Sequence, residues 1–276
     1  MTEAAEFVEI DWRGRAVSIE YQWVGTHRTG APLVVFLHEG LGSLSMWRDF
    51  PQQFCDAAQC RGLVYSRPGY GQSTPRAEDE VWGVDYMHRQ AYEVLPALLR
   101  ILNVDASAQP LWLLGHSDGA SIALLYAARH SAELAGLMVL APHTFVEEIS
   151  VTSIAAARSA YLNTDLPKRL GRYHANPDSA FWGWNRIWLD AEFRRWSIQP
   201  EVATIRCPVL AVQGLDDEYG TLEQVHSIER NTPHTELLAL PHCGHSPHRD
   251  QTEQLLQASR LFMQRQAPLP ALSRTP

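Results

Sequence analysis

Lysine is almost absent from this 276-residue sequence, since Lys168 is the only lysine among 23 basic residues. Arginine side chains match phosphate groups well, but these arginines are scattered, and a GC-rich coding sequence explains the bias as simply. We therefore infer no binding function from them. Basic residues are also outnumbered by acidic ones, and the formal net charge of -8 argues against nonspecific binding to nucleic acid or to an anionic membrane.

Cysteines are few, and long apolar runs are missing. The four cysteines match no zinc framework, and the chain is too long for a disulfide-stapled mini-domain, so we expect reduced thiols in a cytoplasmic protein. The first residues contain no basic region followed by an apolar core, which excludes a signal peptide. No apolar run approaches the ~20 residues that a membrane span requires.

Short apolar runs alternate with helical patterns along the chain. We expect eight strands, two of them within 7–25 and one each within 31–40, 61–73, 110–117, 134–142, 207–214 and 235–245. Helices are expected near 46–58, 81–104 (interrupted at Pro96), 118–130, 221–231 and 252–266. This alternation predicts an α/β fold: a mostly parallel, twisted eight-stranded sheet with helices on both faces.

The pattern changes over residues 144–206, which contain helical stretches and tryptophans but no obvious buried strand. We call this segment the insertion and predict that it forms a helical lid. Residues 1–143 and 207–276 then form the core, and the proline-rich residues 267–276 are expected to fray. A lid at the carboxyl edge of the strands would cover the place where open α/β sheets bind ligands.

One serine lies between an apolar strand and an apolar helix, in Gly115-His116-Ser117-Asp118-Gly119. This G-x-S-x-G pattern in that context predicts a nucleophile on a sharp turn, where small flanking residues let strand and helix approach closely. The helix N-terminus would favour developing negative charge. The alternative is a serine that only caps the helix.

A serine nucleophile requires a general base and a group that orients the base. Asp216 and Asp217 follow an expected strand, and His245 lies in a glycine-flanked loop before the last helix. Serine, aspartate and histidine thus occur in the order used by one architecture of this kind. Taken separately, the aspartates could form a turn and the histidine could be a surface residue.

An oxyanion hole is expected in the glycine-rich loop that follows an early strand, Phe36–Ser43. A backbone N–H of Gly40 or Glu39 could act with that of Asp118. Such donors typically stabilise a transition state by roughly 3–4 kcal/mol. The alternative is an ordinary glycine-rich turn.

These motifs resemble the α/β-hydrolase family over essentially the whole chain. The matching stretches are 38–42, 66–73, the Ser117 turn, 214–217 and 244–245. The resemblance implies a Ser117–His245–Asp217 triad, with Asp217 preferred over Asp216, and implies no cofactor. In two places the sequence departs from the family pattern, because Glu39 replaces a usual glycine and Ser66 replaces a usual aspartate.

Several histidines and tryptophans are candidates for the substrate pocket. His38, His116, His143, Trp182, Trp184 and Trp188 are assigned there, although His143 could be an ordinary loop residue and most of the tryptophans could only pack the lid. A metal site is not expected, because the loop that contains His242, His245 and His248 cannot hold them on one face.

The sequence predicts a serine hydrolase that cleaves a small, apolar or aromatic carboxylic ester or lactone through an acyl-enzyme. The alternatives are a carbon–carbon bond hydrolase of aromatic ring-fission products, an acyl-CoA thioesterase and a non-catalytic ligand-binding protein. Dehalogenase and epoxide hydrolase activities are disfavoured because those relatives carry aspartate at position 117. The physiological substrate and the oligomeric state stay open.

Overall fold

The apolar runs form one central sheet in the computed structural model, which describes residues 4–77 and 79–266. The strands are β1 (Glu6–Trp12), β2 (Arg15–Val24), β3 (Leu33–Leu37), β4 (Arg61–Tyr65), β5 (Leu111–His116), β6 (Leu134–Leu140), β7 (Val209–Gly214) and β8 (Thr235–Leu240). Their order is β1-β2-β4-β3-β5-β6-β7-β8. β2 pairs antiparallel with β1 and β4, and the other neighbours are parallel, so the predicted fold class is confirmed.

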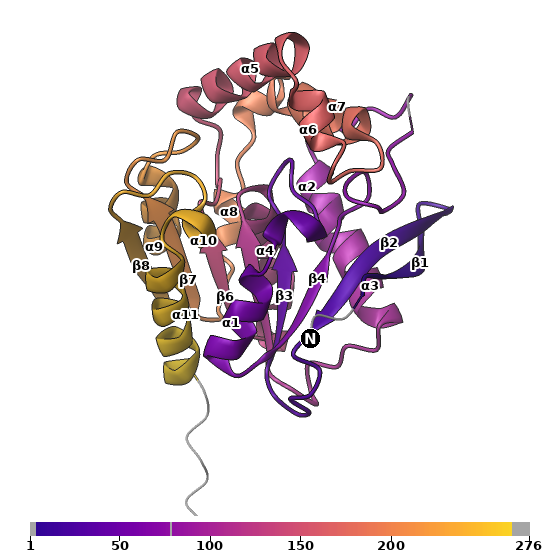
Figure 1. Ribbon diagram of the computed structural model, residues 1–276. Coiled ribbons are helices and arrows are strands. Elements are labelled where there is room, and N and C mark those ends of the chain that lie inside the picture. Colours follow the sequence, from indigo (N-terminus) through magenta and orange to yellow (C-terminus); the bar gives the residue numbers. More distant parts are fainter. Residues whose placement is uncertain (1–3, 78, 267–276) are drawn as a thin grey trace, which may run out of the picture.

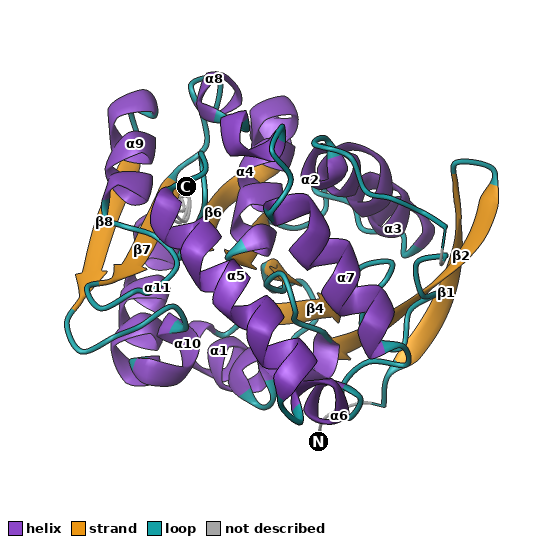
Figure 2. Ribbon diagram, turned by 90° about the horizontal axis from the view of Figure 1, so that it is seen from above, coloured by secondary structure: helices purple, strands orange, loops and turns teal. Residues whose placement is uncertain are grey.

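Helices cover both faces of the sheet (Figure 2). α1 (Phe50–Ala58) and α11 (Thr252–Gln266) pack on one face, and α3 (Leu95–Ile101), α4 (Asp118–His130) and α9 (Glu223–Asn231) pack on the other. The central strands supply both cores because successive side chains point to opposite faces. In β3, for example, Val34 and Phe36 contact the α1/α11 side, while Val35 contacts the α4 side.

Two predicted helices are divided in the structure. The expected helix at 46–58 is a 3-10 turn, η1 (Leu44–Trp47), followed by α1, because Arg48 has a φ of 54°. The expected helix at 81–104 consists of α2 (Tyr86–Arg89), a π-helical turn η2 (Gln90–Val94) and α3. Pro96 lies in the first turn of α3, where its missing N–H is tolerated, so the interruption precedes it.

The insertion contains α5 (Glu148–Asn163), α6 (Leu166–Leu170), α7 (Pro177–Trp188), η4 (Phe193–Arg195) and α8 (Gln199–Val202). α5, α6 and α7 lie beyond the upper edge of the sheet (Figure 1). That edge is formed by the carboxyl ends of the parallel strands, which point toward these helices. The remaining short helices are η3 (Ser131–Glu133) and α10 (Pro247–Asp250).

The parallel sheet has a switch point beside β3. The connection after β3 runs to β4 on one side, whereas the connection after the adjacent β5 runs to β6 on the other side, so the switch point lies between β3 and β5. Such a point opens a crevice at the carboxyl ends of the strands. Within residues 4–77 and 79–266, no helix is long and apolar enough to cross a membrane. The predicted frayed tail, 267–276, lies outside the described residues.

Truncation of a core residue of α11 should test this packing. Phe262 is fully buried, with its ring 5.7 Å from that of Trp112. We expect Phe262→Ala to lower the free energy of unfolding by about 3–5 kcal/mol in urea denaturation. The neighbouring Leu261 is 38% exposed, so Leu261→Ala should change the free energy of unfolding by no more than about 0.5 kcal/mol. Equal effects would contradict the assigned packing of α11.

Candidate active site

Ser117 lies on a strained turn between β5 and α4. Its φ of 53° is in the left-handed region, which is uncommon for a residue with a side chain. A Cβ atom on Gly115 would clash with the backbone of Gly119, and one on Gly119 would clash with the carbonyl of Leu37. The two glycines therefore allow the close crossing of strand and helix that the sequence pattern predicts.

The structure brings Ser117, His245 and Asp217 together. Nε2 of His245 lies 2.9 Å from Oγ of Ser117, and Nδ1 lies 2.9 and 3.0 Å from the two carboxylate oxygens of Asp217. Burial raises the pKa of the Asp217 carboxyl, but the hydrogen bond and charge of His245, with the amide of Tyr219 and the charge of His143, together hold the pKa below its usual value. The carboxylate is therefore charged where it accepts the Nδ1 proton.

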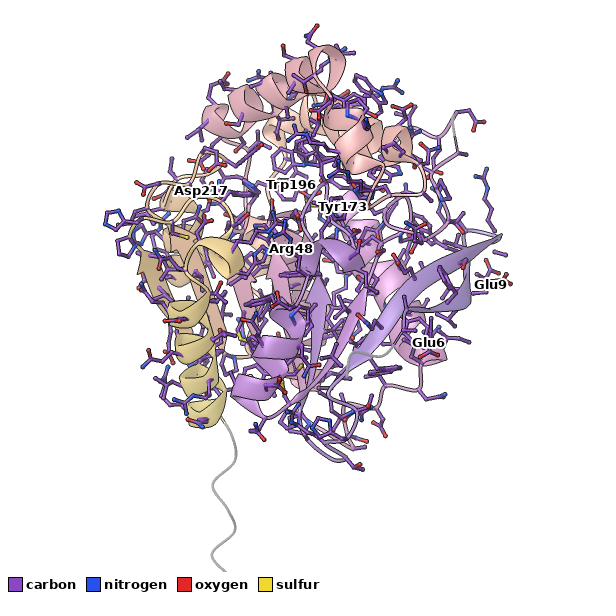
Figure 3. All side chains as sticks on the ribbon, viewed as in Figure 1. Glu6, Glu9, Arg48, Tyr173, Trp196 and Asp217 are labelled. Atoms are coloured by element: carbon purple, nitrogen blue, oxygen red, sulfur yellow. The ribbon has the colours of Figure 1, made fainter. Side chains whose placement is uncertain are left out.

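The geometry distinguishes the two neighbouring aspartates. Asp216 is exposed, whereas Asp217 is buried and faces His245. The Asp217 carboxylate also accepts hydrogen bonds from the side chain of Gln213 (2.6 Å) and the amide of Tyr219 (2.8 Å). Figure 3 labels Asp217 among the loops above the sheet. Three donors thus fix the carboxylate beside the imidazole.

The peptide between Glu39 and Gly40 is held from one side. The carbonyl of Glu39 accepts hydrogen bonds from Nδ1 of His38 (2.7 Å) and from the guanidinium of Arg67 (2.8 Å). Nε2 of His38 accepts from the amide of Arg67, so this imidazole is a neutral tautomer. Burial, and then the charge of Arg67, keep the pKa of His38 well below its usual value.

Fixing that carbonyl fixes the opposite side of the peptide as well. In a trans peptide the C=O and the following N–H point in opposite directions, and Gly40 lines the pocket above Ser117. Among the described residues, no group accepts a hydrogen bond from the N–H of Gly40 or Asp118. These two donors are free to bind an oxygen atom next to Oγ.

The side chain of Asp118 enters a buried polar network. Its carboxylate accepts hydrogen bonds from the hydroxyl of Tyr86 (2.8 Å) and the indole of Trp188 (3.2 Å), and lies 3.9 Å from Arg67. Burial raises its pKa, against the opposing effects of Arg67, Tyr86 and Trp188. Asp118 therefore joins the Ser117 turn to α2 and to α7 of the insertion.

A small cavity of about 110 Å³ lies above Ser117. Of the predicted pocket residues, His116, His143, Trp184 and Trp188 line it, together with Glu39, Gly40 and Asp118 of the predicted oxyanion hole. Ile154 and Tyr219, which the sequence did not single out, also line it. We call this cavity the acyl pocket. A larger hollow of about 830 Å³ runs along α2 and η4 but contains none of the three triad residues.

Two predicted pocket residues lie elsewhere. His38 is fully buried beneath the loop, where its ring nitrogens bind backbone groups. Trp182 is half-buried and contacts Tyr161 and Phe181, with Arg158 and Arg186 over its ring. It lies on a face of α7 different from that of Trp184 and Trp188, because residues two apart on a helix do not share a face.

His242, His245 and His248, which are spaced three residues apart, do not point toward a common site. His242 is exposed, and the ring of His248 is buried 4.8 Å from that of Trp47. The remaining member of the series is His245. Its backbone carbonyl accepts a hydrogen bond from Nε2 of His116 (2.6 Å). Within the described parts of the chain, no group of three His, Cys, Asp or Glu side chains is arranged to hold a metal ion.

The sequence profile described as "Alpha/beta hydrolase family" matches residues 34–258. The chain belongs to this family. Membership bears out the resemblance seen in the motifs and the expectation that the protein is a hydrolase.

Solved structures with the same fold cover nearly the whole chain. An esterase from Thermogutta terrifontis superposes with a TM-score of 0.71 at 19% identity, covering 96% of this chain and 100% of its own. The enol-lactonase from Burkholderia xenovorans LB400 superposes with a TM-score of 0.71 at 17% identity, covering 94% of this chain and 100% of its own. A meta-cleavage product hydrolase from Pseudomonas fluorescens IP01 gives 0.68 at 16% identity, with 94% and 98% covered.

A curated relative matches over a shorter region. The 2-succinyl-6-hydroxy-2,4-cyclohexadiene-1-carboxylate synthase of Enterobacter sp. (strain 638) is 33% identical over 116 residues. This region is 42% of the present chain and 40% of the synthase, so the match spans less than half of either protein.

Sequence reasoning did not single out several residues around the site. Gln213 could have been found, because a polar side chain in a buried strand just before the acidic turn requires a partner. Tyr86 and Arg67 gave no such signal, because their partners at Asp118 and Glu39 are distant in sequence.

The steric role of Gly119 should be measurable. Gly119→Ala places a Cβ against the backbone of Leu37, so we expect a loss of about 1–3 kcal/mol in the free energy of unfolding. Gly171→Ala is the matched control. Gly171 has a helical φ of -61°, and its added Cβ would meet no atom closer than 3.5 Å, so the change should stay within about 0.5 kcal/mol. A neutral Gly119→Ala would contradict the close crossing.

Proposed function

We propose that the protein is a serine hydrolase that cleaves a small carboxylic ester or lactone through an acyl-enzyme. The observation that carries this proposal is the 2.9 Å contact between Oγ of Ser117 and Nε2 of His245, on a turn whose φ is 53°. A strained residue is retained where a constraint requires it, and here the strain aims a hydroxyl at an imidazole.

In the acylation step, Nε2 of His245 takes the Oγ proton as Ser117 attacks the carbonyl carbon. The carbonyl oxygen becomes an oxyanion between the N–H groups of Gly40 and Asp118. Asp217 holds the imidazole in orientation and stabilises its charged form. The intermediate collapses when the alcohol oxygen leaves with the proton from His245, and the acyl group stays on Oγ.

Deacylation repeats these steps with water. His245 takes a proton from a water molecule, the resulting hydroxide attacks the acyl carbon, and the Oγ–carbon bond breaks. The proton returns to Oγ, and the free acid leaves. We further propose that the insertion acts as a lid, because Ile154, Trp184 and Trp188 supply walls of the acyl pocket and exclude water from it.

Carbon–carbon bond and thioester hydrolysis would use the same groups, so substrate comparison is needed. We would assay a phenyl ester, a lactone, an acyl-CoA and a vinylogous diketone in parallel and compare kcat/KM values. The reaction of the curated synthase is not favoured by the charge of the pocket. Its named compound is a carboxylate, and no lysine or arginine lines the acyl pocket in the described parts of the chain.

The triad is tested by two substitutions and a matched control. Ser117→Ala should lower kcat on the best substrate by roughly ten thousand-fold or more, and Asp217→Asn by a similar factor, because the imidazole would lose its orienting anion. Asp216→Asn changes an exposed neighbour and should leave kcat within about twofold.

Labelling provides an independent measurement. A serine-directed phosphonate should add one phosphonyl group to the folded protein and none to Ser117→Ala, as read by intact-mass spectrometry. Full turnover by Ser117→Ala would exclude this mechanism. An absence of both turnover and adduct in the wild type would favour a non-catalytic ligand-binding protein.

A further inference from the structure

The acyl pocket is mainly apolar and has no lysine or arginine among the described residues that line it. Ile154, Trp184, Trp188 and Tyr219 provide its apolar and aromatic surface. The acidic residues among its lining are Glu39 and Asp118. A carboxylate on the acyl group would therefore be desolvated without an opposite charge, which is strongly unfavourable.

Most buried polar side chains of the lining already have partners. Ser117 and His245 bind one another, and Nε2 of His116 donates to the carbonyl of His245. The carboxylate of Asp118 accepts from Trp188 and from the buried Tyr86 behind the pocket. Apart from Nδ1 of His116, which has no hydrogen-bond partner but lies 3.6 Å from a carboxylate oxygen of Glu39, these groups are bonded within the protein before any substrate binds.

His143 differs from these side chains. It is 2% exposed, its Nδ1 is buried without a hydrogen-bond partner, and no hydrogen bond to its Nε2 occurs among the described residues. Its backbone is fixed, because its amide donates to Oγ of Ser121 (3.2 Å) and its carbonyl accepts from the same hydroxyl (2.6 Å). Its ring packs edge-on against Trp188 at 4.9 Å and lies 5.8 Å from the ring of His245.

The imidazole of His143 is neutral in the working pH range. Burial and then the charge of the neighbouring His245 lower its pKa to about 3. A neutral imidazole offers one donor and one acceptor nitrogen. A buried nitrogen without a partner is unfavourable, and in a pocket the substrate can supply the missing partner.

We propose that His143 is a specificity-determining residue that hydrogen-bonds to an uncharged hydroxyl or oxo group on the acyl part of the substrate. The preferred substrates are then esters or lactones of small hydroxy or oxo acids without a second carboxylate. This inference rests on the proposed function. It adds a substrate class, which the triad alone does not specify.

Four phenyl esters test the proposal: the butyrate, the 2-hydroxybutyrate, the 3-hydroxybutyrate and the hydrogen succinate. Each kcat/KM is divided by the rate of hydroxide-catalysed hydrolysis of the same ester, which removes differences in intrinsic reactivity. For the wild type, we expect at least one hydroxy ester to exceed the butyrate by about tenfold or more, and the succinate to fall about tenfold or more below it.

Substitutions assign the preference to His143. His143→Phe keeps a ring against Trp188 but removes the nitrogens. The corrected kcat/KM of the hydroxy ester should then lie within about threefold of the corrected kcat/KM of the butyrate. His143→Asn retains a donor and an acceptor and should restore part of the preference for the hydroxy ester. If His143→Phe fails to fold, as judged by circular dichroism, His143→Leu takes its place.

The outcomes separate the two proposals. Wild-type turnover of the butyrate with no preference for either hydroxy ester overturns the role of His143 and leaves the serine mechanism standing. A preference that survives in His143→Phe or His143→Leu overturns it as well, and efficient turnover of the succinate overturns the uncharged substrate class. Failure of the wild type to hydrolyse any ester or to react with the phosphonate overturns both proposals.

Discussion

The close crossing of β5 and α4 at Ser117 is the constraint on which the rest of the site depends. A non-glycine residue at a φ of 53° is strained by about 1–3 kcal/mol, and surrounding structure must hold it there. The amide of Ser117 donates to the carbonyl of Leu140 in β6 (2.9 Å), and the carbonyl of Ser117 accepts from the amides of Ala120 and Ser121 in the first turn of α4. Because Gly115 and Gly119 have no Cβ, strand and helix can approach closely enough to keep both bonds.

The crossing also determines where the neighbouring groups lie. It brings the carboxylate of Asp118 to Tyr86 and Trp188 and near the buried guanidinium of Arg67. That guanidinium in turn holds the carbonyl of Glu39, which leaves the opposite side of the peptide facing the pocket. One buried charge pair therefore links the nucleophile turn to the loop with the second N–H donor. A pair of this kind adds little net stability, but removing either member would leave an uncompensated charge.

Features encoded by neighbouring residues could be predicted from the sequence. The central strands appear as continuous apolar runs because both faces of a parallel sheet are buried, and the pattern around Ser117 predicts a turn that needs two small residues. Family pattern selected Asp217 over Asp216, and burial places Asp217 beside His245. The π-helical turn at Gln90–Val94 was missed, because periodicity indicates a helix without specifying its hydrogen-bond spacing.

Contacts between distant residues could not be predicted in the same way. Trp188 and Tyr86 lie 102 positions apart, and nothing near either residue indicates that their side chains meet at Asp118. The sequence placed Trp182 in the pocket with Trp184 and Trp188, but only the orientation of α7 decides which tryptophans face Ser117. The unpartnered Nδ1 of His143 is likewise a property of the packed structure.

The residues around Ser117 and the residues that wall the pocket come from different parts of the chain, but they contact one another. Ser117, Asp217 and His245 follow β5, β7 and β8, whereas Ile154, Trp184 and Trp188 come from the insertion. Trp184 lies so close to Gly40 that any Cβ there would clash with its indole. The indole of Trp188 donates a hydrogen bond to the carboxylate of Asp118, the residue after Ser117. A substitution that reshapes the pocket at either tryptophan therefore also perturbs the Gly40 loop or the Ser117 turn, so the pocket and these two segments cannot be altered independently.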